Sequence, residues 1–200
     1  MPATKFTPSI ASRPVYGGLK SHGAVPALML ANGPGGEALL ELIKADPSVL
    51  PHTYMIYIPE GCDLGRSLEA CGPASFFEAA SYASILPRFR KLLADAGMNT
   101  RLYLAGTEGL IGQATSEALA AGMLLEAIDA EHRGSVARRM QCVHCKGITE
   151  NVTTDPFTCS HCGLTLFVRD HYSRRHAAFQ GVCVDAETPG EIPPRQEIKA

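Results

Sequence analysis

The chain has 200 residues, 46% of them hydrophobic and 19% charged, with a formal net charge of −2. This composition suits a packed globular protein and excludes broad disorder, and the length allows one ordinary domain plus a small module. No apolar run approaches the length of a membrane span, and the first residues lack the basic start and apolar core of a signal peptide. We therefore expect a cytoplasmic protein with no membrane contact.

The charges are unevenly distributed along the chain. Residues 1–131 hold 9 basic and 13 acidic side chains, a net −4, and residues 177–200 hold 2 and 4, a net −2. Residues 132–176 hold 7 basic and 3 acidic side chains, a net +4. This basic stretch either docks onto an acidic partner or forms a solvated face with no partner, and the sequence leaves both open.

The first 135 residues are predicted to form an extended arm followed by an α/β domain. Residues 1–24 are rich in proline and glycine and are expected to be the arm. Three short apolar runs, at residues 27–31, 54–58 and 102–105, are typical of strands buried on both faces. Helical patterns alternate with them, which predicts a small, mostly parallel sheet with crossover helices in a domain spanning residues 25–135.

The helices of this domain are predicted from apolar spacing and from helix stop signals. One follows the first strand and carries Leu39, Leu40 and Ile43. A helical region is expected from about Ser75, and Pro87 is expected to open another helix. Further predicted segments are a helix over residues 111–121 and a short final strand over residues 124–128. No further strand is visible between residues 58 and 102.

Four cysteines form the clearest chemical signal. Cys142 and Cys145 make one Cys-x-x-Cys pair, and Cys159 and Cys162 make a second pair after a gap of 13 residues. Each pair can form a tight knuckle that offers two thiolates, so the spacing predicts a four-sulfur metal site. We expect these four residues to be the metal ligands.

The segments around the cysteines predict a small β module. Residues 148–152 and 164–168 alternate in the manner of strands, and Gly163 permits the positive φ that turns a knuckle back on itself. Residues 136–184 are therefore expected to form a zinc-ribbon or rubredoxin-like hairpin. Residues 185–200, which contain three prolines, are expected to be an extended C-terminal tail.

The sequence favours zinc in this site but keeps a single iron as the alternative. A closed four-cysteine site suits both metals; zinc would only stabilise the hairpin, whereas iron would make it an electron carrier. His144 and His161 lie inside the knuckles and are expected at the surface. The remaining cysteines, Cys62, Cys71 and Cys183, have no framework spacing and are interpreted as reduced thiols.

A basic segment at residues 169–179 follows the second knuckle. It holds three arginines and two histidines next to two aromatic residues, so it could contact an anionic surface, a carboxylate or nucleic acid, or simply form a solvated turn. An acidic remainder and few aromatic residues weigh against nucleic acid. His171 and His176 are poorly spaced for a metal pair on a helix. No catalytic motif is found, so we predict no catalytic residues.

Residues 25–131 resemble the nicotinamide-binding domain of the ferredoxin-reductase family. The resemblance is carried by a glycine-rich turn after the first strand, residues 32–36, and by the late pattern of residues 101–111, Ala121-Gly122 and 128–131. The turn lies where backbone N–H groups could meet a phosphate, but it does not match G-x-G-x-x-G.

Two departures from that family indicate a lost activity. Ala105-Gly106-Thr107 replaces the Cys-Gly-Pro turn, which removes the thiol that the family places near the nicotinamide. Only about 24 residues precede the domain, so the flavin-binding barrel is not expected in this chain. The resemblance therefore implies a degenerate domain reused as a docking scaffold, with no cofactor-binding residues assigned.

Taken together with the cysteine module, the chain resembles the small accessory subunit of bacterial dimethylamine monooxygenase. In the cysteine module, this resemblance is carried by the two knuckles, by residues 167–175 and by residues 179–182. The resemblance implies a complex that uses a reduced nicotinamide and oxygen to convert dimethylamine to methylamine and formaldehyde. It also implies partners: a haem-containing oxygenase subunit, and a reductase subunit that carries flavin and an iron–sulfur cluster.

Three functional classes remain open at this point. A non-catalytic assembly subunit predicts zinc and no turnover alone. An electron-transfer subunit predicts iron with a visible absorption band. A zinc-ribbon nucleic-acid-binding protein predicts affinity that falls steeply with salt. The first is preferred on the resemblance.

Overall fold

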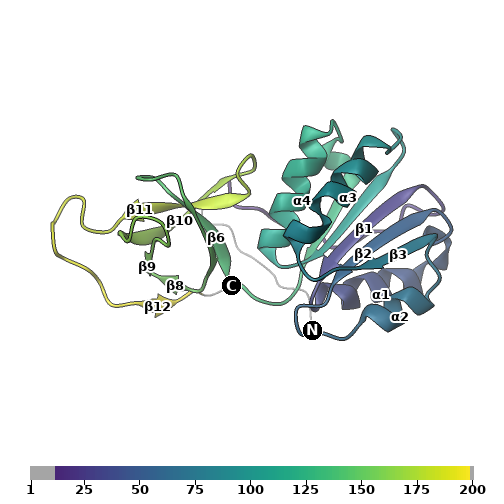
Figure 1. The fold of residues 1–200 in the computed structure, drawn as a ribbon, viewed down its shortest axis with the longest axis horizontal. Coiled ribbons are helices and arrows are strands. Elements are labelled where there is room, and N and C mark those ends of the chain that lie inside the picture. The colour runs from purple at the N-terminus through teal and green to yellow at the C-terminus, as the bar shows by residue number, and fades with distance from the viewer. Residues whose placement is uncertain (1–11, 199–200) are drawn as a thin grey trace. The chain divides into compact units, whose positions relative to one another are not determined.

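The computed structural model describes residues 12–198, and these fall into two compact units (Figure 1). The first unit comprises residues 16–134. The second comprises residues 135–198 together with residues 12–15.

A five-stranded parallel sheet forms the centre of the first unit. The strand order is β3-β2-β1-β4-β5, so the chain reverses its direction of winding between β1 and β4. This arrangement confirms the predicted parallel α/β fold. The strands are β1 (Ala27–Asn32), β2 (Thr53–Ile58), β3 (Ser75–Glu78), β4 (Arg101–Gly106) and β5 (Ile128–His132).

Helices cover both faces of this sheet (Figure 1). Met29 and Ala31 of β1 pack in the cluster with α1, whereas Leu28 and Leu30 pack in the cluster with α3 and α4. Both faces are buried, which is why the strands are continuous apolar runs. Within the described residues, no helix is both long and apolar enough to cross a membrane. The helices are α1 (Gly35–Ala45), α2 (Gly65–Ala70), α3 (Tyr82–Ala94) and α4 (Glu108–Ala120).

The region from Ser75 is a strand, so the predicted helix there is wrong. Phe76 packs against the α1 side of the sheet and Phe77 against the α3 side, which is the two-residue alternation of a strand. This strand, β3, is the one that the sequence did not reveal between residues 58 and 102. Its four residues are too few to distinguish one period from the other in the sequence.

The prediction that Pro87 opens a helix is also wrong. Helix α3 begins at Tyr82 after Ser81, and Pro87 lies inside it. Ile85 and Phe89 are buried on either side of Pro87, so one apolar face continues through the proline. The Ser81 side chain accepts the Ser84 N–H at 3.3 Å while Ser84 Oγ accepts the Ser81 N–H, also at 3.3 Å. This reciprocal cap fixes the start of the helix.

Two further boundaries differ from the prediction. Helix α4 begins at Glu108 rather than at residue 111, directly after the glycine turn of β4. The last strand lies at Ile128–His132, because residues Leu125–Ala127 form a 3-10 turn instead of the expected strand.

Residues 16–22 lie along the open edge of β5. The Gly18 N–H donates to the Ala130 carbonyl at 3.1 Å, and His22 Nε2 lies 2.8 Å from Asp129 Oδ2. An uncovered edge strand would offer unpaired backbone groups, and this segment covers part of that edge. Residues 1–11 of the predicted arm lie outside the described residues.

The second unit is built from short strands around the cysteine knuckles. One sheet has the order β7-β6-β11-β10-β9, and a two-stranded sheet pairs β12 with β8. The strands predicted at residues 148–152 and 164–168 correspond to β7 and the start of β10. The bounds are β6 (Arg138–Cys142), β7 (Ile148–Val152), β8 (Thr154–Asp155), β9 (Phe157–Thr158), β10 (Thr165–Ser173), β11 (Ala178–Cys183) and β12 (Gln196–Glu197).

Replacing the α3 cap tests the observed start of that helix. Ser81→Ala removes the acceptor for the Ser84 N–H, so the free energy of unfolding should fall by about 1 kcal/mol in urea denaturation. Ser67→Ala, at an exposed position in α2, is the matched control and should change it by less than about 0.5 kcal/mol. Equal effects of the two substitutions would contradict the cap assignment.

Candidate metal centre

The structure brings the four predicted cysteines together. Their sulfur atoms all lie within 4.8 Å of one another. Cys142 Sγ is 3.8 Å from Cys162 Sγ, and Cys145 Sγ is 3.7 Å from Cys159 Sγ. A tetrahedral ion with metal–sulfur bonds of about 2.3 Å places its sulfurs about 3.8 Å apart. The cluster therefore has the size and donor set that one zinc or iron ion requires.

The two knuckles repeat the same backbone hydrogen bond. The Cys142 N–H donates to the Gly147 carbonyl at 2.9 Å, and the Cys159 N–H donates to the Leu164 carbonyl at 2.9 Å. In each case the acceptor lies five residues after the first cysteine of the pair. The knuckles are thus two copies of one turn, each presenting two sulfurs to a common point.

A left-handed residue closes each knuckle. Gly163 has φ +75°, as expected from the sequence, and its N–H donates to the Cys159 carbonyl at 3.1 Å. Lys146 occupies the equivalent position of the first knuckle with φ +64°. The glycine that follows it, Gly147, could adopt such a positive φ with less strain. A Cβ on Gly147 would lie 2.4 Å from His161 Cδ2, so Gly147 is needed for close packing instead.

The two thiols of the second knuckle have pKa values shifted in opposite directions. Burial raises the pKa of Cys159, but the N–H groups of Cys162 and His161 outweigh it and lower that pKa to about 6. At Cys162 the Leu164 N–H lowers the pKa, yet burial and the neighbouring thiols raise it to about 12. One thiolate thus forms readily and resists the next by like-charge repulsion. A bound metal ion would remove that repulsion.

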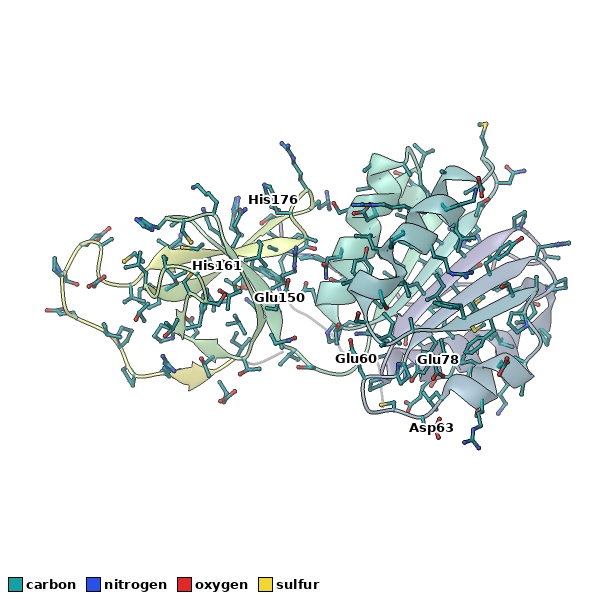
Figure 2. The ribbon with its side chains drawn as sticks, viewed as in Figure 1. Glu60, Asp63, Glu78, Glu150, His161 and His176 are labelled. Atoms are coloured by element: carbon teal, nitrogen blue, oxygen red, sulfur yellow. The ribbon has the colours of Figure 1, made fainter. Side chains whose placement is uncertain are left out.

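The cluster is half open to solvent. Cys142 and Cys159 are buried, whereas Cys145 and Cys162 are exposed. His161 Nε2 lies 2.8 Å from the Ile148 carbonyl oxygen, and its ring is exposed (Figure 2). His144 is exposed as well. A metal ion here would be held by protein on one side and would have two exposed sulfurs on the other.

The remaining thiols lie outside the cluster. Cys62, Cys71 and Cys183 are free and partly buried. Cys183 Sγ donates to Asp185 Oδ1 at 3.0 Å, and that hydrogen bond raises the pKa of the thiol. Cys71 Sγ donates to the Ser67 carbonyl at 3.2 Å within its own helical turn.

The sequence did not reveal an ion pair that joins β6 to β10. Arg138 is buried, its Nη1 donates to Asp170 Oδ1 at 2.6 Å, and its guanidinium stacks over the Phe179 ring at 4.7 Å. Arg13 also approaches Asp170, at 3.6 Å. The alternation of residues along β6 could have indicated that Arg138 is buried, because Arg138, Met140 and Cys142 lie on the same buried side of the strand. Asp170 therefore has a structural role within the segment that was read only as basic.

The comparisons with known proteins agree with both parts of the chain. Residues 8–128 match the N-terminal domain of "Dimethylamine monooxygenase subunit DmmA-like", and residues 139–182 match the C-terminal domain of the same family. The chain belongs to the dimethylamine monooxygenase subunit DmmA-like family. The resemblance predicted from the sequence is confirmed.

A curated relative adds a more specific likeness. The chain is 37% identical over 97 residues to the heme-dependent oxidative N-demethylase delta subunit of Ectopseudomonas mendocina (strain ymp). The aligned part covers 48% of this chain and 55% of that protein, so the chain spans about half of the relative's length.

The two left-handed positions give opposite predictions for matched substitutions. Lys146→Gly relieves a conformation that costs an L-residue about 1 kcal/mol, so it should raise the free energy of unfolding by about 0.5–1 kcal/mol. Gly163→Ala introduces the same strain in the second knuckle and should lower it by about 1 kcal/mol. Urea denaturation of the purified protein measures both. Changes of the same sign would contradict the two-knuckle geometry.

Proposed function

We propose that this chain is a non-catalytic assembly subunit of a haem-dependent monooxygenase that N-demethylates dimethylamine to methylamine and formaldehyde. It joins a haem-containing oxygenase subunit to a reductase subunit that carries flavin and an iron–sulfur cluster. The observation that carries the proposal is the family match over both units, together with a relative that is itself named as a delta subunit.

The four-cysteine cluster supports a structural role for the metal. We assign zinc to Cys142, Cys145, Cys159 and Cys162, and in this assignment protein sulfur would fill all four tetrahedral positions. A site filled in this way leaves no position for a substrate or a water molecule. Zinc supplies binding energy there, and that energy becomes folding energy of the second unit.

The charges of the two units suit contacts with different partners. Residues 16–134 hold 8 basic and 13 acidic side chains, a net −5. In the second unit, the turn between β10 and β11 exposes Arg174, Arg175 and His176 in succession (Figure 2 labels His176). An acidic unit and a basic turn on one chain can meet surfaces of opposite charge on two other proteins, which steers their assembly.

Electron transfer is the second candidate function. Its supporting observation is the exposure of Cys145 and Cys162, which would place two metal-bound sulfurs at the surface. Iron in the same site would then lie close enough to a docked partner to exchange electrons with it. The two functions differ in the metal that they require.

Metal analysis with a matched pair of cysteine variants tests the ligand assignment. The purified full chain should contain one zinc per molecule and show no visible absorption band. Cys159→Ser should lose that zinc and unfold the second unit, because metal binding stabilises the fold. Cys183→Ser changes a cysteine of the same unit that lies outside the cluster, so it should keep the zinc.

Two results of that experiment would contradict the assignment. One iron per chain would contradict the structural role of zinc and would support electron transfer as the function. Unchanged metal content in Cys159→Ser would show that the cysteine cluster is not the metal site.

Reconstitution of the complex tests the assembly role. When the haem and reductase subunits are mixed with the chain, size-exclusion chromatography should give one co-eluting complex. Without the chain the two subunits should elute separately at low concentration, and dimethylamine-dependent oxidation of the nicotinamide should fall at least about 10-fold, because bridging raises their effective concentration. Equal complex size and equal turnover without the chain would contradict the proposal.

A further inference from the structure

The fold of the first unit carries a nucleotide site in many proteins, and its position can be located here. In open parallel sheets the ligand binds outside the carboxyl ends of the strands, where the strand order reverses. In this chain that point lies between β1, which ends at Asn32, and β4, which ends at Gly106. A dinucleotide would need to reach the turn of residues 33–36, which leads into α1.

The Asn32 side chain fills this crossing point. It is 2% exposed, and its Oδ1 accepts the Thr107 N–H at 2.9 Å. Its Nδ2 donates to Thr107 Oγ1 at 2.9 Å and to Glu60 Oε2 at 2.7 Å. A Cβ on Gly106 would lie only 1.8 Å from Asn32 Oδ1. The carboxyl ends of β1, β2 and β4 are therefore joined by one hydrogen-bonded latch, formed by Asn32, Glu60 and Thr107.

The glycines of the turn pack against protein atoms. A Cβ on Gly35 would lie 2.2 Å from the Ala105 carbonyl oxygen, and one on Gly36 would lie 2.9 Å from Tyr57 Cε2 and 3.0 Å from Leu64 Cδ1. Glycine is thus required here by the close approach of β4, β2 and the loop after β2.

Carboxylates also lie at this edge. Glu60 belongs to the latch. Glu78 packs closely against Gly65, because a Cβ on Gly65 would lie 1.8 Å from Glu78 Oε2. Glu108 is 6% exposed at the first residue of α4, and its Oε1 accepts the Tyr16 hydroxyl at 3.0 Å. Figure 2 shows Glu60 and Glu78 on the same side of the unit. A phosphate brought to this edge would meet like charge.

Arg133, an arginine near this edge, already forms ion pairs within the protein. Arg133 directly follows β5, and its N–H donates to the Gly106 carbonyl at 2.8 Å. Its guanidinium lies 2.6 Å from Glu41 and 2.6 Å from Glu131, with Glu37 at 3.9 Å. Burial opposes the charge of this guanidinium, but the hydrogen bonds that it donates to Glu41 and Glu131 outweigh burial and raise the pKa of Arg133. Arg133 therefore forms ion pairs with carboxylates of the protein itself rather than with a ligand phosphate.

We propose that this unit keeps the dinucleotide-binding topology with its site closed by its own side chains, and that it does not bind a nicotinamide dinucleotide. The latch and its carboxylates take the place of a ligand and hold the strand ends together. The reduced nicotinamide of the proposed reaction is then bound by another subunit; this last clause alone rests on the proposed function.

A ligand titration of the purified full chain tests the closed site. With NADH or NADPH up to about 1 mM, a range that covers typical nicotinamide enzymes, calorimetry should show no saturable heat. A nicotinamide-dependent reductase in the same titration serves as the positive control. Hydrogen exchange of residues 32–37 should be the same with and without NADH. Saturable binding, or slowed exchange in these residues, overturns the proposal.

A pair of variants tests the latch itself. Asn32→Ala should lower the melting temperature by several degrees, because it leaves the Thr107 N–H without its acceptor. Glu60→Gln keeps a carbonyl oxygen that can accept the hydrogen bond from the Asn32 amide. It should change the melting temperature by no more than about one degree. A melting temperature of Asn32→Ala equal to that of the unaltered chain overturns the latch. This result is independent of complex assembly, so it separates the closed site from the proposed function.

Discussion

The proposed sharing of one metal ion by four thiolates is the interaction on which the second unit depends. Among its described residues, the hydrophobic cluster at its centre contains eight buried residues, and two of them are the cysteines Cys142 and Cys159. A core of this size cannot offset the entropy of folding by apolar burial alone. On this proposal the ion would fix the two knuckles, and the knuckles would fix the starts of β7 and β10. The Arg138–Asp170 pair joins β6 to β10.

The first unit reaches stability by a different route. Its sheet is covered on both faces by apolar clusters of its own residues. The same topology in a dinucleotide-binding protein leaves an open crevice at the carboxyl ends of β1 and β4. Here Asn32 spans that crevice and carboxylates line its edge, so the domain is held together where a cofactor would otherwise enter. In the function that we propose, both units contribute rigid surfaces rather than chemistry.

The sequence predicted the features that depend on spacing and missed those that depend on tertiary contacts. The cysteine pairs and the long apolar strands follow from local pattern, and both are present. Strand β3 was missed because four residues carry too little periodicity, and Pro87 was misread because a buried face continues through it. The role of Asn32 could not be predicted, since its partners are 28 and 75 residues away in the chain.

The central claim is that this chain contributes shape and no electrons to its complex. An anaerobic reductive titration of the purified full chain tests it directly. With zinc in the four-cysteine site and no nicotinamide bound, the chain should accept no electrons, because zinc has no redox chemistry. Uptake of one electron per chain, with a matching loss of visible absorption, would contradict the account and make the chain an electron carrier.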